Sequence, residues 1–392
     1  MKIACISNSN NFFSTLTQYL RDEGLDVTLL VMPNEGQDTF HHPSADCFDD
    51  SWKEFTKEIS WGDSSSHTFI KSIFTNKIKN QIKEDLKPYD FLIGTQLAPA
   101  YCKLVGRKLN IQFPMGADTR IFPHYNFFKK GYIKPNRLEH NYRAYFQKEG
   151  IRESEYVISG LNARDQLLLL KPKGIFLDLC VPAFYEKHFS TIGIETKSIF
   201  YEKFKAIRES CDIMVFSQNR QWWWGYGNEI LIKGLHLFVQ KYPNENIKVV
   251  MFEYGHEIHL TKALIAELSL EKYIAWMPPM PRKELILGLK LADIGANELS
   301  QSWVMAGSIF ECFALGKPLI QYREDDQYKH LFNELPPILN AHGEEAVFYQ
   351  LEQYLINKEQ VKEVGNQSKK WYQEQVINKS ILSIVDIIKK KS

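Results

Sequence analysis

Short apolar runs alternate with longer amphipathic stretches along the whole chain, and this alternation limits the fold more than any other feature. Residues 2–7 and 26–31 have the composition of buried strands, and residues 13–23 between them have the spacing of a helix. Strands that alternate with helices are typical of parallel sheets crossed by helices. The opening segment therefore predicts a βαβ unit, and the chain as a whole predicts an α/β fold.

The alternation extends through both halves of the chain. In the first half we expect further strands at residues 90–94, 111–113, 156–159 and 174–181. In the second half we expect strands at residues 212–216, 247–252, 273–276, 294–296 and 318–322. A chain of 392 residues suits two domains better than one core. We expect an N-terminal domain over 1–200, a C-terminal domain over 201–372, and a terminal helix over 373–392 that can pack back on the N-terminal domain.

Composition excludes several classes of function. The net charge is +1 from 48 basic and 47 acidic residues, which gives no general electrostatic reason to expect a nucleic-acid partner. Six cysteines are spread along the chain without a C-x-x-C pair, which is typical of reduced thiols. The chain opens directly into a strand without the zones of a signal peptide, and no apolar run reaches the length of a membrane span. We therefore expect a cytoplasmic protein.

Two cations follow the first expected strand of the second half. Arg220 lies just after the strand at 212–216, and Lys233 lies early in the next helix. Because parallel sheets bind ligands beyond the carboxyl ends of their strands, both cations are candidates for a ligand site. Arginine binds phosphate oxygens through two donors and lysine adds a point charge, so the pair can hold a diphosphate. Solvated surface charges are the alternative interpretation.

A glycine-bounded segment late in the second half predicts a loop, a short helix and a buried strand. Gly307 and Ser308 open the expected helix, where free backbone amides and the helix dipole favour a phosphate. Glu311 lies one turn further and can accept hydrogen bonds from the two hydroxyls of a ribose. A first-turn glutamate that only stabilises the helix dipole is the alternative.

Together these motifs resemble the retaining glycosyltransferases of family 4, which have the two-domain GT-B fold. The resemblance is clearest over residues 210–323, where its matching positions are Arg220, Lys233-Gly234, Ala292-Asp293-Ile294 and the run from Glu311 to Pro318. In the first half, residues 113–118 and 181–189 resemble further segments of the family. The resemblance implies two Rossmann-like domains that face each other across a cleft, and a retaining sugar transfer that needs no metal ion.

Carried over position by position, the resemblance assigns roles to single residues. It implies that Arg220 and Lys233 hold the donor diphosphate, that Glu311 binds the ribose, and that Gly307 and Ser308 lie beside the phosphates. The implied partners are a nucleotide-sugar donor and a glycan, lipid-linked or protein acceptor. The donor is a co-substrate, and no cofactor is implied.

The chain also departs from the family. The family has a second glutamate eight positions before the ribose-binding one, where this chain has Trp303, and Glu298 lies nearby but out of register. The first loop, at residues 8–11, lacks the family's glycines. Asn10 is the candidate donor contact in this loop, and a helix cap is the alternative. These departures leave the donor sugar and the stereochemical outcome open.

Several side chains are candidates for contact with the sugar or the acceptor. The resemblance implies that Gly116 lies near the transferred sugar, and Asp118 is our first choice for a side chain beside it, with a turn-capping role as the alternative. His124 is a weaker candidate, and Glu298 is a further candidate for contact with the sugar or the acceptor. Indole faces can pack on sugar rings or between domains, and three indoles follow Arg220: Trp222, Trp223 and Trp224.

The remaining features bear on metals, membranes and competing functions. His256 and His259 lack the spacing of a metal-binding pair, so we expect no metal site. The aromatic and basic stretch at 125–132 and the lysines at 389–391 can contact a membrane surface peripherally, with ordinary packing as the alternative. A nucleotide-sugar epimerase of the same fold and a catalytically silent sugar-binding protein are the competing functions.

Overall fold

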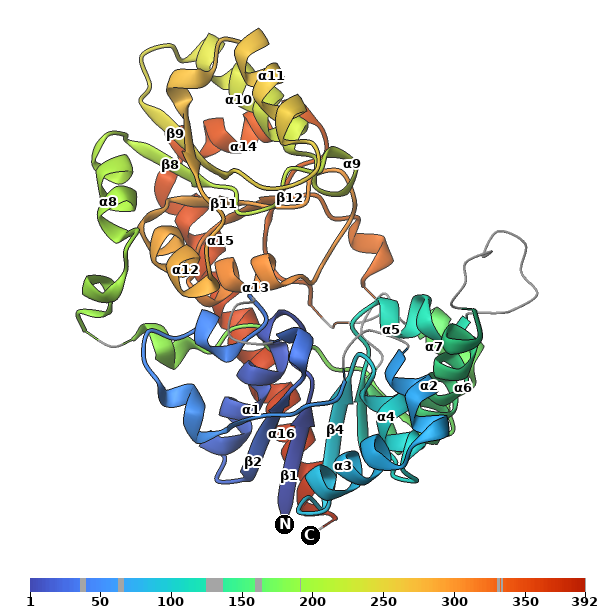
Figure 1. Ribbon diagram of the computed structural model, residues 1–392. Coiled ribbons are helices and arrows are strands. Elements are labelled where there is room, and N and C mark those ends of the chain that lie inside the picture. The colour runs from blue at the N-terminus through green and yellow to red at the C-terminus, as the bar shows by residue number, and fades with distance from the viewer. Residues whose placement is uncertain are drawn as a thin grey trace. The chain divides into compact units, whose positions relative to one another are not determined.

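The computed structural model describes residues 1–35, 40–62, 67–124, 137–158, 164–190, 192–329, 332 and 334–391. These residues form two compact units, which can be followed in Figure 1. Unit 1 comprises Met1–Tyr185 and Asn378–Ser392, and unit 2 comprises Glu186–Ile377. The last helix of the chain therefore belongs to unit 1, although it follows unit 2 in sequence.

Unit 1 is built on a parallel sheet of seven strands in the order β3-β2-β1-β4-β5-β6-β7. Its strands are β1 (Lys2–Ile6), β2 (Asp26–Val31), β3 (Thr56–Glu58), β4 (Phe91–Thr95), β5 (Ile111–Phe113), β6 (Tyr156–Ile158) and β7 (Ile175–Leu177). In the register of the central strand, Ile3 pairs with Val27 on one side and with Phe91 on the other. Strands β1 and β4 are almost continuously buried, which explains their unbroken apolar runs.

The helices of unit 1 cover this sheet and include the end of the chain. They are α1 (Phe12–Asp22), α2 (His67–Phe74), α3 (Lys77–Leu86), α4 (Ala98–Leu104), α5 (Ala117–Arg120), α6 (Arg137–Glu153), α7 (Arg164–Leu170) and α16 (Lys379–Lys389). Helix α16 packs against α1, and Oγ of Ser380 donates a hydrogen bond to the carbonyl of Cys180 at 2.6 Å. Lys391 also forms an ion pair with Glu155 at 3.0 Å. These contacts hold the C-terminal helix on unit 1.

Unit 2 repeats the architecture with a parallel sheet of six strands in the order β10-β9-β8-β11-β12-β13. Its strands are β8 (Ile213–Phe216), β9 (Ile247–Phe252), β10 (Ile274–Met277), β11 (Ile294–Ala296), β12 (Leu319–Gln321) and β13 (Leu339–Asn340). Its helices are α8 (Tyr201–Glu209), α9 (Trp223–Tyr226), α10 (Asn228–Lys241), α11 (Ile258–Glu267), α12 (Arg282–Leu291), α13 (Gly307–Ala314), α14 (Glu344–Ile356) and α15 (Lys358–Trp371).

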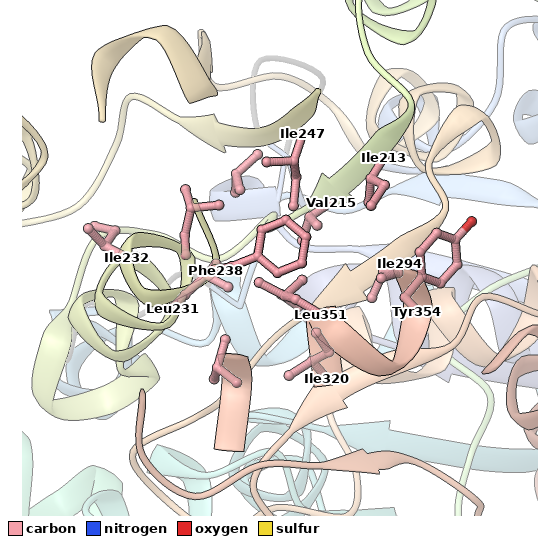
Figure 2. Close-up of a cluster of buried hydrophobic side chains, with 14 of the residues drawn as sticks. Ile213, Val215, Leu231, Ile232, Phe238, Ile247, Ile294, Ile320, Leu351 and Tyr354 are labelled. Carbon is pink, nitrogen blue, oxygen red and sulfur yellow. The ribbon is translucent and has the colours of Figure 1, made fainter. Parts of the chain in front are cut away.

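The core of unit 2 joins the sheet to helices α10 and α14. Figure 2 shows the cluster, in which Val215 from β8, Phe238 from α10 and Leu351 from α14 are all buried. Gly234 allows the two helices to approach closely, because a Cβ there would lie 2.5 Å from Cγ1 of Val347. This packing gives the strands fixed ends from which the loops of the site project.

The structure confirms the α/β class and two Rossmann-like parallel sheets. It also contains two strands that the sequence did not indicate, β3 and β13. Both are short edge strands with polar or exposed residues, so neither carries the apolar run that identifies a buried strand. The stretch at 125–132, which we considered for membrane contact, lies outside the described residues.

Within the described residues, no helix is both long and apolar enough to cross a bilayer. The same residues contain no group of three or more His, Cys, Asp or Glu side chains placed to hold a metal ion. The six cysteines are free thiols, and each is buried.

Candidate functional site in unit 2

The order of strands in unit 2 reverses between the neighbours β8 and β11, and this point organises the candidate site. In open parallel sheets, ligands bind beyond the carboxyl ends of the strands at such a reversal. The segment after β8 contains Gln218 and Arg220, and the segment after β11 contains Asn297 and Glu298. Four polar or charged side chains that are distant in sequence therefore follow two adjacent strands.

Helix α13 lies close against β11 at this end of the sheet. A Cβ on Gly295 would lie 2.5 Å from Sγ of Cys312, so the glycine permits the close approach of helix and strand. The segment after the helix turns at Gly316, which has a left-handed φ of +67°. At the other end of α13, Gly307 and Ser308 are only partly buried, and their backbone amides have no partner within the helix. The amides and the helix dipole favour an anion at this position.

The carboxylate of Glu311 is the centre of a buried polar network. The residue is 4% exposed, and its Oε1 lies 2.7 Å from Nε of Arg282 on α12. Nε2 of Gln218 donates a hydrogen bond to the other carboxylate oxygen at 2.5 Å. Glu311 lies beyond the first turn of α13, which holds no acidic residue, so the alternative of a first-turn glutamate that balances the helix dipole is wrong. The network links the ends of β8, α12 and α13.

Arg282 is a residue of this site that the sequence analysis did not single out. A Cβ on Gly307 would lie 3.6 Å from Nη2 of Arg282, so the guanidinium stands beside the first residue of α13. Arg282 is itself the first residue of α12, where a positive charge opposes the helix dipole. This unfavourable local position is a signal that could have indicated a tertiary partner.

Arg220 is exposed and lies over aromatic rings that follow it in the chain. Its Cζ is 5.1 Å from the centroid of Trp222 and 5.6 Å from that of Tyr226. Tyr254, after β9, donates a hydrogen bond from its hydroxyl to the carbonyl of Gln218 at 3.2 Å. Burial raises the pKa of Tyr254 to about 12. The charge of Glu311 also raises this pKa, and the charge of Arg220 lowers it. Arg220 and Glu311 therefore lie within electrostatic reach of the same tyrosine.

Lys233 is an exposed residue of α10. Its charge acts on Glu229, one turn earlier: burial raises the pKa of Glu229, and the charge of Lys233 offsets part of this rise. Gly234 beside it faces α14, as the core packing requires. The two cations that the sequence paired thus have different local partners: aromatic rings for Arg220 and a glutamate for Lys233.

The three consecutive tryptophans have three different environments. Trp223 is anchored to α11, because its Nε1 donates a hydrogen bond to Oγ1 of Thr261 at 2.9 Å and its backbone amide donates to Glu257 at 2.5 Å. Trp222 lies between Arg220 and the ring of Trp224, whose centroid is 5.3 Å away. Trp224 is 69% exposed. Trp223 is therefore a structural anchor, and Trp224 presents an open indole face.

Trp303 and Glu298 both lie in the segment between β11 and α13. The main chain of Trp303 is attached to the end of β12, because Nε2 of Gln321 donates a hydrogen bond to its carbonyl at 2.7 Å. Glu298 is 4% exposed, and burial raises its pKa to about 7. The charge of Glu298 acts on the pKa of both Tyr226 and Cys312, so this carboxyl lies near α9 and α13.

In unit 1 the segment after β5 folds around Asp118. Its carboxylate accepts hydrogen bonds from the backbone amides of Met115 at 3.0 Å and Gly116 at 2.7 Å. Burial, partly offset by these hydrogen bonds, raises the pKa of Asp118 to about 7. Gly116 has a φ of +129°, which a residue with a side chain rarely adopts. The geometry is that of a turn-closing aspartate, and His124 lies in the short helical turn that follows.

The loop after β1 is held by asparagines in place of glycines. Asn10 and Asn11 have positive φ values of 53° and 60°, and the backbone amide of Asn10 donates to Nδ1 of His41 at 2.9 Å. The side chain of Asn11 donates to Asp46 at 2.8 Å, and that of Asn8 accepts from the amide of Ser14 in α1 at 2.8 Å. The loop therefore adopts a conformation usual for glycine, and Asn8 caps the following helix.

The two sheets and their strand order define an α/β protein with two Rossmann-like units, the architecture of GT-B structures. Among solved structures, the chain is similar to HepE of Anabaena in complex with UDP and glucose, with a TM-score of 0.63, 11% identity and 100% of both chains covered. It is also similar to a glycosyltransferase from Rickettsia africae, with a TM-score of 0.60, 13% identity, and 100% of this chain and 98% of that chain covered.

The similarity extends to an enzyme of another class. UDP-GlcNAc 2-epimerase from Neisseria meningitidis, bound to UDP-GlcNAc, matches with a TM-score of 0.59, 12% identity and 100% of both chains covered. No protein-family model and no curated protein sequence matches the chain. At these identities the similarity defines the fold, which glycosyltransferases and UDP-GlcNAc 2-epimerases share.

Proposed function

We propose that this protein is a glycosyltransferase that moves a sugar from a nucleotide-sugar donor to a glycan, lipid-linked or protein acceptor. The observation that carries the proposal is the network of Glu311, Arg282 and Gln218 at the start of α13 and the ends of the strands. The carboxylate of Glu311 can bind ribose hydroxyls. The guanidinium groups of Arg220 and Arg282 and the N-terminus of α13 can bind the phosphates of a nucleoside diphosphate. GT-B neighbours, among them HepE with UDP and glucose, support the same class.

In the proposed reaction, the negative charge on the leaving diphosphate grows as the bond to the sugar breaks. Arg220, Arg282 and the amides of Gly307 and Ser308 stabilise this charge, so the reaction needs no metal ion. Lys233 adds a further positive charge to the donor half. The ribose hydroxyls donate to Glu311, whose carboxylate is already oriented by Arg282. The acceptor hydroxyl attacks from the face of the leaving group, its proton passes to a phosphate oxygen, and configuration is retained.

The remaining candidates have supporting roles in this proposal. Asp118 shapes the turn that presents Gly116 to the transferred sugar, and it acts through that turn. Asn10 contacts the donor from the loop after β1, in which Asn10 and Asn11 both have positive φ values. Trp224 offers an open indole face to a sugar ring, with Trp222 behind it. His124 lies beside the acceptor.

The second candidate function is a nucleotide-sugar epimerase of the same fold. The observation in its favour is the similarity to UDP-GlcNAc 2-epimerases, which reaches a TM-score of 0.59. An epimerase needs an acid and a base that act on the sugar carbon. Glu298 is a carboxyl group with a pKa raised to about 7 by burial, but the described residues at this end of unit 2 show no basic partner in hydrogen bond with its Oε2.

Incubation with isotope-labelled nucleotide-sugars separates the candidates. Release of free sugar without an epimer supports the transferase, because hydrolysis is the slow reaction of a transferase that lacks its acceptor. Accumulation of the epimer supports the second candidate. A protein that binds donors and converts none of them is the catalytically silent sugar-binding protein, and the transferase proposal is then wrong.

A pair of variants tests the cation assignments by calorimetry with nucleoside diphosphates. Arg220→Ala should weaken binding by at least about tenfold, since a charge-assisted hydrogen bond contributes about 1.5–3 kcal/mol. Lys233→Ala should weaken it less, because the charge of Lys233 already interacts with Glu229. Lys262→Ala is a matched control, since this exposed lysine pairs only with Glu253 among the described ion pairs. Unchanged affinity in a folded Arg220→Ala variant would remove the phosphate role.

A further inference from the structure

Three buried side chains at the reversal of the sheet, Gln218, Asn297 and Glu298, carry polar atoms without partners, and we call them the switch-point cluster. Within the described part of the chain, Nδ2 and Oδ1 of Asn297, Oε2 of Glu298 and Oε1 of Gln218 have no hydrogen-bond partner. The three residues are 3%, 4% and 6% exposed, in the order Asn297, Glu298 and Gln218. A buried polar group without a partner destabilises the folded state. The cluster therefore carries a cost that the free protein does not recover.

Gln218 and Asn297 lie together because their strands are neighbours, and Glu298 directly follows Asn297 in the chain. In the parallel register, Ile294 pairs with Val215 and Gly295 pairs with Phe216. Continuing this register by two residues places Asn297 opposite Gln218. Main-chain hydrogen bonds continue past the strand end, since the amide of Asn297 donates to Ile320 at 3.0 Å. The cluster is thus held by the sheet, and it adjoins the proposed nucleotide site because Nε2 of Gln218 donates to Glu311.

The chemistry of the free atoms selects a class of ligand. Most of these atoms are oxygens that accept hydrogen bonds. The amide nitrogen of Asn297 is a donor. A phosphate offers acceptors and negative charge, so it would be repelled by these oxygens and by Glu298. Sugar hydroxyls donate and accept at once, and buried hydrogen bonds to them discriminate strongly between ligands. Neutral, hydroxyl-rich ligands fit this cluster, whereas anionic groups fit the cations beside α13.

We propose that the switch-point cluster binds hydroxyl groups of the transferred sugar, and that Asn297 and Glu298 recognise this sugar. This inference rests on the proposed function, because it assigns the sugar half of the same donor. Burial also raises the pKa of Glu298 to about 7, so its carboxyl can donate as well as accept near neutral pH.

The test compares binding of UDP with binding of UDP-glucose and UDP-GlcNAc by calorimetry, in the full chain and in Asn297→Leu and Glu298→Gln. Each variant should keep the wild-type affinity for UDP within about threefold and lose at least about tenfold in affinity for the nucleotide-sugar that the wild type prefers. Gln112→Met is the matched control. Gln112 is fully buried in unit 1 and both of its amide atoms lack partners in the described residues, so its loss should leave both affinities unchanged.

A thermal unfolding measurement distinguishes binding from a structural role. Asn297→Leu removes an unpartnered polar group, so its melting temperature without ligand should equal or exceed that of the wild type. A lower melting temperature with unchanged sugar affinity would mean that Asn297 supports the loop, and the inference would be overturned. If the wild type binds neither UDP nor nucleotide-sugars, the proposed function fails first. If the wild type binds UDP and a nucleotide-sugar, and the variants keep both affinities, the proposed function stands and the assignment of the cluster to the sugar is wrong.

Discussion

Arg282 and Glu311 form an ion pair, buried at the glutamate and half-buried at the arginine, in which Nε of the arginine lies 2.7 Å from Oε1 of the glutamate. The pair joins the first residue of α12 to the helix that opens with Gly307 and Ser308. It sets the direction in which the carboxylate faces, since Gln218 occupies the other oxygen. A donor ribose would therefore meet a carboxylate that is already oriented, so it need not be ordered on binding.

Replacing one partner of the ion pair should lower the free energy of unfolding more than replacing both partners with apolar residues. Arg282→Met leaves Glu311 as an uncompensated buried charge and should lower the free energy of unfolding by about 3–5 kcal/mol. Arg282→Met combined with Glu311→Met should be less destabilised than Arg282→Met alone, because apolar pairs often replace buried ion pairs at little cost. Urea unfolding of the two single variants and the double variant measures this coupling. Additive losses would show that the two residues do not act as a pair.

The pH dependence of stability should report on Glu298. Burial raises the pKa of this carboxyl from 4.5 to about 7, so the folded state binds the proton more tightly than the unfolded state. Its stabilising contribution is therefore complete below a pH of about 4.5 and is lost as the pH rises through about 7. Glu298→Gln removes this dependence, on the order of 3 kcal/mol, and should be more stable than the wild type at pH 8.

Denaturant unfolding at pH 5 and at pH 8 measures the effect of Glu298→Gln. Asp118→Asn is the companion variant, because burial also raises the pKa of Asp118 to about 7 and its loss should remove a similar dependence from unit 1. Wild-type and Glu298→Gln stabilities that change in parallel between the two pH values would contradict the assignment.

Substitutions of the adjacent residues Trp223 and Trp224 should have different effects, the first on stability and the second on turnover. Trp224→Ala should change the free energy of unfolding by less than about 0.5 kcal/mol, because the side chain is 69% exposed. It should lower turnover with an acceptor by about three- to tenfold, if the indole packs on a sugar ring. Trp223→Phe loses the hydrogen bond to Thr261 and should instead destabilise the protein by about 1 kcal/mol. Thermal unfolding and a transfer assay on both variants would show the opposite pattern if these roles were exchanged.

The approach of α13 to β11 should depend on the absence of a side chain at Gly295. Gly295→Ala places a Cβ 2.5 Å from Sγ of Cys312 and should destabilise the protein by about 1–3 kcal/mol through overpacking. It should also weaken binding of nucleoside diphosphates, because the helix N-terminus must move. Adding Cys312→Ala removes the atom in conflict, and the double variant should recover most of the stability and affinity. If the double variant is no more stable than Gly295→Ala, the contact with Sγ of Cys312 is not the cause of the destabilisation.

The sequence predicted much of each sheet, because a strand buried on both faces must be mostly apolar. The runs that became β1, β4, β8 and β9 are of this kind. Edge strands lack this constraint: β3 is the polar segment Thr56–Glu58, and only its pairing with β2 makes it a strand. Pairing of this type depends on a neighbour that is distant in sequence, so local composition does not indicate it.

By itself, the sequence determined the α/β class, the succession of elements and the helix that opens at Gly307, because periodicity and glycine placement act over a few residues. Only the tertiary structure decided which side chains meet. It paired Glu311 with Arg282, and it directed the carboxylate of Asp118 onto the backbone amides of its own loop. Among the described residues, it left the side-chain amide of Asn297 without a hydrogen-bond partner. The physical reason is that a parallel sheet brings the ends of distant strands together, and the geometry of that edge depends on strand order, register and helix packing at once.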